Sequence, residues 1–360
     1  MKIAILSMQK VYNYGSVLQA YSLKKIIEEI IGEDVDFLNP QYDKKIPVNM
    51  EVKDNNDYEG EIYIDNKFSF YTKKAINKFK NKQFKKKIKE FQDEILKLDE
   101  NNINKKYDVV VEGSDEVFKC KRGIFYNLYG EVQNAQKLIT YAASCGSANI
   151  KGISNDNIPL VKEIMKNFNA MSVRDNNTEL YIKDLYNGKI EMHLDPVLVG
   201  CLNKREHKPV KHKNYMIVYA YGDRIHKKEE INAIKQYAKE NNLKTLAIGA
   251  PQYWCDEFIA VSPFEALDYF FNAKCIVTDT FHGTIFSIIN KCKFATIVRK
   301  TNQNKLQDLL KKLNLSNQEV RDIGKLDEIL ERDINYNEVE DIIEKERIRT
   351  REYLTNNLKL

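Results

Sequence analysis

Residues 2–38 read KIAILSMQKVYNYGSVLQAYSLKKIIEEIIGEDVDFL, and this stretch decides the fold. Its first part, Lys2–Leu6, is a short apolar run that is typical of a buried strand. The turn Asn13-Tyr14-Gly15-Ser16 follows, with Ser16 as a candidate N-cap for a helix from Val17 to Ile31. A second strand is expected at Val35–Leu38. Strand, glycine turn, helix and strand in this order predict the opening of a doubly wound α/β domain.

The same alternation of strands and helices continues beyond this opening, and it runs on both sides of one polar segment. That segment, Leu202–Asn214, is basic and contains Pro209, so we expect it to be an interdomain linker. The sequence therefore predicts an N-terminal α/β domain over residues 1–201 and a C-terminal α/β domain over residues 215–330. A charged helix at about 337–356 is expected to close the chain and to pack back on the N-terminal domain.

Residues from about 50 to 104 interrupt this rhythm as an insertion in the N-terminal domain. The first part is acidic and rich in turn residues. The second part, Tyr71–Leu98, predicts a basic helix with one apolar stripe. The run Lys85-Lys86-Lys87 is expected to be a solvated helix face rather than a binding patch.

Composition narrows the class of protein. The chain has 57 basic and 52 acidic residues, a net charge of +5, which does not suggest a nucleic-acid partner. This small excess is compatible with anionic substrates, or with loose attraction to an anionic membrane surface. No C-x-x-C pair and no metal-like Cys/His cluster occurs, so we expect reduced thiols and no metal. Without an evident signal peptide or spanning segment, the expected location is the cytoplasm, including the inner face of the membrane.

The stretch from Val277 to Ser287, VTDTFHGTIFS, places a histidine between a predicted strand and a predicted helix. The amides at a helix start point outward and favour anions, which makes Gly283-Thr284 a candidate anion site. His282 beside it is a candidate general acid or base. The alternative is that His282 only braces the turn. Asp279 could hydrogen-bond His282 or cap the following helix.

Other short patterns also fall at the carboxyl ends of predicted strands, where open α/β sheets bind ligands. Gly113-Ser114-Asp115 follows one strand, and Ser172-Val173-Arg174-Asp175 ends another. Asp115 is a second candidate acid or base, and a helix N-cap is an equally good interpretation. We interpret Asp195-Pro196 as a structural strand end. We expect the other histidines at strand ends or on the surface; they are His193, His207, His212 and His226.

Taken together and in this order, these motifs resemble the polysaccharide pyruvyl transferase family. The resemblance runs from Lys2 to about Arg299, and its marks include Asn13–Tyr21, Leu194-Asp195-Pro196 and Asp279–Thr284. It implies two Rossmann-like domains that face each other across a cleft, as in the two-domain (GT-B-type) glycosyltransferases. It also implies transfer of the enolpyruvyl unit of phosphoenolpyruvate, as a ketal, to a sugar of a cell-surface glycan or its lipid-linked precursor. Phosphoenolpyruvate would be a substrate, and no cofactor is implied.

Phosphoenolpyruvate is a small trianion near neutral pH, so its site needs cations and oriented amides. His282 and Asp115 are the expected catalytic residues. The expected substrate-binding residues are Asn13, Gly15, Ser16, Ser114, Arg174, Gly283 and Thr284.

The chain departs from the family at one informative place. Characterised ketal pyruvyl transferases carry Arg-Leu-His where this chain has Thr280-Phe281-His282, so the histidine is kept and the arginine is not. The missing arginine favours two alternatives. One is a glycosyltransferase that uses a nucleotide-sugar on the same scaffold, and the other is a non-catalytic glycan-binding relative.

Overall fold

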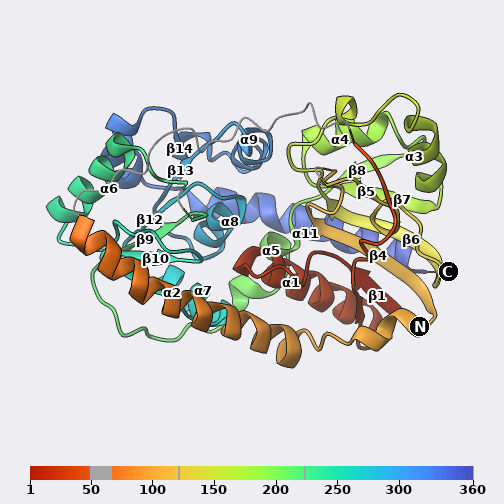
Figure 1. The fold of residues 1–360 in the computed structure, drawn as a ribbon, viewed down its shortest axis with the longest axis horizontal. Coiled ribbons are helices and arrows are strands. Elements are labelled where there is room, and N and C mark those ends of the chain that lie inside the picture. Colours follow the sequence, from red (N-terminus) through yellow and green to blue (C-terminus); the bar gives the residue numbers. More distant parts are fainter. Residues whose placement is uncertain (49–66, 121, 223, 360) are drawn as a thin grey trace.

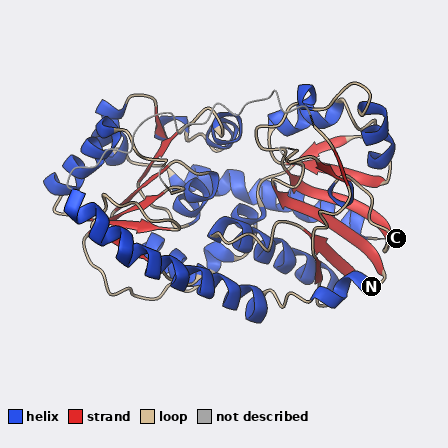
Figure 2. Cartoon of the chain, in the orientation of Figure 1, coloured by secondary structure: helices blue, strands red, loops and turns tan. Residues whose placement is uncertain are grey.

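The computed structural model describes residues 1–48, 67–120, 122–222 and 224–359. It contains two six-stranded parallel sheets, each flanked by helices (Figure 1, Figure 2). The two α/β units lie side by side and confirm the expected pair of Rossmann-like domains. The acidic, turn-rich part expected from residue 50 onward lies largely outside the described residues, which omit 49–66.

The first sheet has the strand order β2-β1-β4-β6-β7-β8. The bounds of its strands are β1 Ile3–Leu6, β2 Asp36–Leu38, β4 Tyr107–Asp115, β6 Ala135–Ala143, β7 Phe168–Val173 and β8 Ile190–Met192. The long central strands β4, which contains three consecutive valines, and β6 are mostly buried, as expected for a parallel sheet that is covered on both faces. A short antiparallel ribbon of β3 (Lys45–Ile46) and β5 (Ile124–Phe125) stands beside this sheet.

The second sheet has the order β11-β10-β9-β12-β13-β14, which is the 3-2-1-4-5-6 order of the doubly wound fold. Its strands are β9 Tyr215–Tyr219, β10 Lys244–Ile248, β11 Glu257–Ile259, β12 Cys275–Thr278, β13 Phe294–Ile297 and β14 Glu319–Val320. The helices around it are α6 Lys228–Glu240, α7 Pro263–Asn272, α8 Phe281–Ile289, α9 Gln303–Lys312 and α10 Leu326–Glu331.

Helix α1 (Tyr14–Ile31) starts earlier than the sequence suggested. Asn13, not Ser16, is its N-cap, because the Asn13 side chain accepts a hydrogen bond from the Ser16 amide at 2.7 Å. Helix α1 and the short α5 (Pro196–Val199) cover one face of the first sheet, whereas α3 (Ile158–Met165) and α4 (Asn176–Lys183) cover the other. The apolar core on the α1 face continues into the second domain without a break.

Helix α11 (Tyr336–Leu358) follows the second domain in the chain but lies against the first, where it contacts α1 and α5 (Figure 1). Tyr353 is buried, and its hydroxyl donates to the Thr140 carbonyl in β6 at 2.8 Å. Thr350 on the same helix bonds the Tyr141 hydroxyl at 3.0 Å. Helix α11 therefore ties the end of the second domain to the sheet of the first.

Helix α2 (Lys67–Glu90) continues as a π-helical turn over Phe91–Ile95 and lies along the second domain (Figure 1). Lys80 reaches the Glu257 carboxylate at 3.0 Å and the Phe258 carbonyl at 2.9 Å. Lys87 pairs with Glu265 at 3.0 Å. Lys85 and Lys86 are exposed, as expected for a solvated face, whereas Lys87 is partly exposed and is paired with a carboxylate of the apposed domain.

Candidate functional site

Both sheets bring their switch points to one cavity. The strand order reverses between β1 and β4 in the first sheet and between β9 and β12 in the second, and ligands bind at the carboxyl ends of strands at such points. The loops that follow these strands meet at an interdomain cavity of about 870 Å³. Its lining residues are Met8, Val11, Asn13, Ser16, Tyr42, Lys45, Asp115, Glu116, Lys119, Arg122, Phe125, Leu128, Arg174, Tyr221, Phe281, His282 and Lys305.

Asp115 lies at the end of β4, at the N-terminal-domain wall of the cavity. Its backbone is left-handed, with φ of 76°, and its side chain accepts a hydrogen bond from Ser16 Oγ at 2.7 Å. No helix begins at Asp115; the nearest amide that it accepts from is that of Glu116, at 2.9 Å. The helix N-cap interpretation of Asp115 is therefore wrong, and the carboxylate stands beside the start of α1.

His282 enters the cavity from the other domain, on the first turn of α8. Thr280 caps this helix by accepting a hydrogen bond from the Gly283 amide at 2.9 Å. The imidazole packs directly on Gly15 of α1, where a Cβ atom would lie only 2.3 Å from His282 Nδ1. Gly15 therefore serves a close approach between the two domains and leaves no room for a larger residue.

A buried cluster of Arg174, Asp195 and His282 joins the two domains at this cavity. Asp195 Oδ2 lies 2.7 Å from Arg174 Nη1 and 3.6 Å from His282 Nε2. Burial alone would raise the pKa of Asp195, but the neighbouring His282 and Arg174 lower it to about 2. The Asp195 side chain is fully buried, so its negative charge faces the Arg174 guanidinium and the His282 ring and no solvent.

The orientation of His282 follows from this cluster. Its Nε2 is buried and faces the Asp195 carboxylate at 3.6 Å, without a hydrogen-bond partner among the described residues. A carboxylate beside one ring nitrogen fixes the proton there and leaves the other nitrogen able to take up or release one. This role of Asp195 was not predicted, because we interpreted Asp195-Pro196 only as a structural strand end.

Asp279, the partner that the sequence offered for His282, is engaged elsewhere. Its carboxylate lies 3.1 Å from Arg224 Nε and 3.6 Å from Arg299 Nε, inside the second domain. It does not cap α8 either, since Thr280 does. Both interpretations of Asp279 are therefore wrong, and its buried ion pairs brace the loop that carries His282.

Four of the expected substrate-binding residues do not line the cavity: Gly15, which packs against His282, and Ser114, Gly283 and Thr284. Ser114 is fully buried and donates to the Ala142 carbonyl at 3.1 Å. Thr284 is also fully buried and donates to the Thr280 carbonyl at 3.0 Å. The Gly283 amide is already bound to Thr280. The start of α8 is thus occupied by its own cap, which contradicts the expected anion site at Gly283-Thr284.

The cavity carries an excess of positive charge that the motifs did not reveal. Its lining holds five Lys or Arg side chains against the two carboxylates Asp115 and Glu116. Lys305 on α9 reaches Glu116 at 2.6 Å across the interface. Burial opposes the ionisation of Glu116, but Lys305 and Lys119 lower its pKa well below the ordinary value. Lys45 and Arg122 form no ion pair with the described residues, so their charges face the cavity unopposed.

Arg174, the one arginine within the motifs, lines the cavity but is largely used inside the protein. Its side chain is only 2% exposed, it pairs with Asp195, and its guanidinium lies 4.2 Å from the Phe281 ring centre. Two histidines expected at strand ends or on the surface, His193 and His226, are buried. Among the described residues no cluster of His, Cys, Asp and Glu could hold a metal ion, and no described helix is long and apolar enough to span a membrane.

Two parallel α/β domains that enclose a charged cavity at their switch points define the class of protein, one built from two Rossmann-like halves. The chain belongs to the polysaccharide pyruvyl transferase family, whose model matches residues 13–301. The matched region contains Asp115, Arg174, Asp195 and His282. No curated protein matches the sequence.

Several solved structures share the general fold at low identity. UGT89C1 of Arabidopsis thaliana, complexed with UDP, is 10% identical with a TM-score of 0.49 and covers 100% of this chain and 99% of its own. A UDP-GlcNAc 2-epimerase of Methanocaldococcus jannaschii is 12% identical with a TM-score of 0.47 and covers 93% of both chains. An O-GlcNAc transferase mutant of Thermobaculum terrenum is 9% identical with a TM-score of 0.44, and it covers 99% of this chain and 66% of its own.

Proposed function

We propose that this protein transfers a pyruvyl group from phosphoenolpyruvate to a sugar of a cell-surface glycan or its lipid-linked precursor, as a ketal. The observation that carries the proposal is the pair of Asp195 and His282, which lies at a cationic cavity between the domains. Membership of the polysaccharide pyruvyl transferase family supports the same reaction.

The charge of the cavity favours a small, strongly anionic donor. Phosphoenolpyruvate carries a carboxylate and a phosphate, and both groups bind well to Lys and Arg side chains. Lys45 and Arg122 line the cavity without an ion-pair partner among the described residues, so they are the best candidates to bind these groups. Arg174 would contribute its field while it stays bound to Asp195.

The proposed chemistry moves two protons. One acceptor hydroxyl attacks C2 of phosphoenolpyruvate, and its proton passes through His282 to the methylene carbon, which becomes a methyl group. Phosphate then leaves, and the second hydroxyl attacks C2 and gives its proton to the departing phosphate. The products are a cyclic ketal and inorganic phosphate. Asp195 stabilises the charged imidazole during the first step, and Asp115 with Ser16 is placed to orient the acceptor hydroxyls.

The test measures phosphate release from phosphoenolpyruvate with a pool of lipid-linked glycans, together with the mass of the product. The wild-type protein should release phosphate and add the mass of a pyruvyl ketal, and His282→Asn should do neither at a comparable rate. Release of no phosphate with any acceptor pool would contradict the proposal.

A nucleotide-sugar glycosyltransferase is the second candidate, and one observation favours it. Thr280 caps α8 where the family carries an arginine, so no guanidinium stands beside His282 on that helix. Ligand-induced thermal stabilisation separates the two candidates. A shift with phosphoenolpyruvate but not with UDP-sugars supports pyruvyl transfer, and the reverse result supports the glycosyltransferase.

A further inference from the structure

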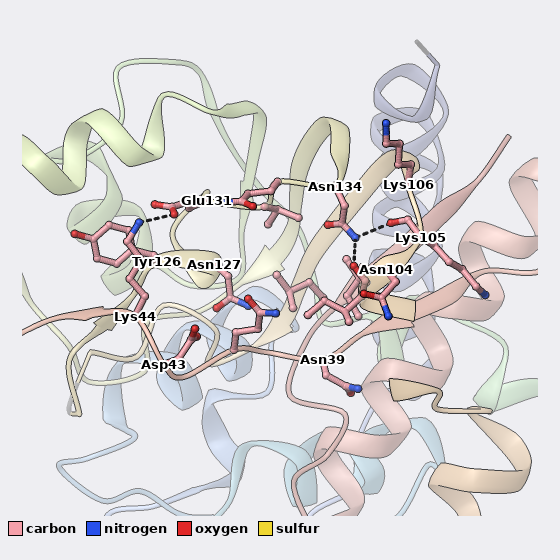
Figure 3. Close-up of a pocket in the computed structure, with 16 residues that line it drawn as sticks. Asn39, Asp43, Lys44, Asn104, Lys105, Lys106, Tyr126, Asn127, Glu131 and Asn134 are labelled. Carbon is pink, nitrogen blue, oxygen red and sulfur yellow. Dashed lines mark hydrogen bonds and ion pairs between the residues drawn. The ribbon is translucent and has the colours of Figure 1, made fainter. Parts of the chain in front are cut away.

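A second cavity, of about 470 Å³, lies in the N-terminal domain outside the interdomain cleft (Figure 3). It opens on the face of the first sheet opposite α1, near the ends of β1 and β2, where Leu6 and Leu38 form its base. The connection from β2 to β4 leaves through α2 instead of laying a helix on this face. Loops therefore surround a space that a crossover helix would otherwise fill.

The polar groups of this cavity are mostly side-chain amides without protein partners. Gln41, Asn104, Asn127 and Gln133 line it and make no side-chain hydrogen bond with the described residues. Each amide offers both a donor and an acceptor, which matches hydroxyl groups that also donate and accept. The volume lies within the roughly 300–1,000 Å³ of small-molecule sites.

The charges of the cavity are nearly balanced. Lys44 pairs with Glu131 at 2.6 Å, and Lys105 pairs with Asp36 at 3.0 Å. The lining charges left without an ion pair among the described residues are one of each sign, Asp43 and Lys106. The lining holds three lysines against two carboxylates, so a phosphate or a nucleotide would meet a smaller excess of positive charge here than in the interdomain cavity.

One wall separates the two cavities. The segments around the ribbon of β3 and β5 send Tyr42, Lys45 and Phe125 to the interdomain cavity. Their neighbours Lys44 and Tyr126 line the second cavity instead. A chain of sugars whose reacting unit lies in the interdomain cavity would therefore meet the second cavity directly beyond this ribbon.

We infer that the second cavity is a binding site for a neutral hexose, and that it holds a remote unit of the glycan acceptor. The second half of this inference rests on the proposed function, whereas the binding of a neutral hexose does not. Binding energy from remote units can be used to orient the reacting unit, which gives the site a role in catalysis by position alone.

The experiment uses the full chain and four probes: glucose, galactose, mannose and N-acetylglucosamine, each followed by saturation-transfer NMR. We expect at least one of them to bind with a dissociation constant of about 1 mM or weaker, because a single ring gains little against the cost of association. Asn127→Leu keeps the branched shape of the side chain and removes its amide. It should weaken binding by about tenfold, the loss that one or two hydrogen bonds produce. Gln133→Ala, on an exposed residue, should weaken it in the same direction.

Two controls separate this site from the rest of the molecule. Asn356→Leu, on the exposed face of α11, should leave hexose binding unchanged. His282→Asn should also leave it unchanged while it abolishes pyruvyl transfer. Hexose binding in a protein that shows no pyruvyl transfer would sustain the binding site and remove only its assignment to the acceptor.

Three results would overturn the inference. The first is that none of the four hexoses binds. The second is that binding is unaffected by Asn127→Leu and Gln133→Ala but lost in His282→Asn, which would place the sugar in the interdomain cavity alone. The third is displacement of the hexose from the wild type by inorganic phosphate but not from Asn127→Leu, which would show an anion site.

Discussion

Asp195 links the two domains, because its fully buried carboxylate lies beside Arg174 of the first domain and His282 of the second. Its pKa of about 2 lies below the ordinary value of 3.8, so Asp195 is ionised at neutral pH. The stability that it adds is complete above about pH 4 and is lost as the pH falls through about 2. Acid therefore breaks the cluster only under strongly acidic conditions.

Asp195→Asn should destabilise the protein strongly. The substitution leaves the Arg174 guanidinium, whose side chain is 2% exposed, without its closest counter-charge. Removal of one partner from a buried ion pair costs about 3–5 kcal/mol. Urea unfolding measures this difference, with Glu191→Gln at the more exposed Lys189 pair as the control, for which about 1 kcal/mol or less is expected. A loss for Asp195→Asn as small as that of the control would show that Asp195 is not ionised.

His282→Asn should lower the turnover number by about 10²–10⁴-fold, the usual contribution of a general acid or base. The protein should stay folded, because the imidazole makes no hydrogen bond with the described residues and approaches Asp195 only to 3.6 Å. Single-turnover rates with phosphoenolpyruvate and circular dichroism test the two parts together. A folded variant that keeps the wild-type rate would show that His282 only supports the turn and takes no part in catalysis.

The sequence could predict the residues that stand in local motifs but not the partnerships between them. Asp115 and His282 lie at strand ends in recognisable patterns, and both line the cavity. The pairing of Asp195 with His282 joins the two domains, so no spacing in the sequence reveals it. The same reason explains why Asp279, which is close to His282 in sequence, was an attractive but wrong partner.

At the scale of elements, the contact between α1 and α8 determines how closely the domains meet. Gly15→Ala should place a methyl group 2.3 Å from His282 Nδ1, so the ring or the whole of α8 must move. We expect a loss of transfer activity close to that of His282→Asn. Gly222→Ala is the matched control, since a Cβ there would meet nothing within 4 Å. Equal activities of the two variants would contradict the observed contact.

His193 connects the pH dependence of stability to helix α11. It is buried, 1% exposed, and bonded to Ser172 Oγ at 2.8 Å, with the Tyr353 ring of α11 over it. Burial lowers its pKa to about 4, from an ordinary value of 6.5, and the nearby Arg349 and Lys312 act in the same direction against Glu191 and Glu346. Between about pH 4 and pH 6.5, His193 is therefore protonated in the unfolded chain but neutral in the folded protein.

The folded protein gains stability from keeping His193 neutral. This contribution to the free energy of unfolding is complete above about pH 6.5 and is lost as the pH falls towards 4. From these two pKa values we expect a loss of roughly 3 kcal/mol in the free energy of unfolding over this interval. Urea unfolding at several pH values measures it. His193→Gln should flatten this part of the profile, and an unchanged slope in that variant would assign the effect to other groups.

Element prediction succeeded for the opening strand–helix–strand unit and for the closing helix α11, and it failed for some short elements of the second domain. The strands expected at Lys2–Leu6 and Val35–Leu38 are β1 and β2, and the helix expected at about 337–356 is α11. Strands β11 and β14 have three and two residues, too few for a periodic pattern. Helix α9 follows no motif and was not predicted. For the same reason Lys305, which lies on this helix, was not recognised as a residue of the site. The contacts of α2 with the second domain could not be predicted, because they depend on tertiary packing. A run of lysines looks the same in sequence whether it faces solvent or another domain.

At the scale of the molecule, two contacts hold the domains together across the mouth of the cavity. Lys305 pairs with Glu116 at 2.6 Å, and Asp308 accepts from the Asn176 amide at 2.8 Å. Both bonds join α9 to the N-terminal domain. These two contacts set the distance between the domains on the side of α9. The contact of Gly15 with His282 sets that distance at the base of the cleft.

Removal of both contacts should open the molecule. The double variant Lys305→Gln with Asp308→Ala should raise the radius of gyration in small-angle X-ray scattering without changing the helix content. Each contact is a partly exposed polar interaction worth about 1 kcal/mol or less, so the two must be removed together. Lys311→Gln on the same helix is the control, and it should leave the radius unchanged. Equal scattering of the double variant and the wild type would mean that the buried core alone holds the domains.

The path of α11 has a consequence for the order in which the protein is made. The last strand of the first sheet ends at Met192, but the helix that covers this sheet begins at Tyr336, after the whole second domain. A ribosome therefore completes the second domain before the first can bury Tyr141 and His193 beneath Tyr353. In nascent chains of this protein, that apolar surface should stay exposed until α11 has been made. We therefore expect chaperones that recognise apolar surface to engage the N-terminal domain.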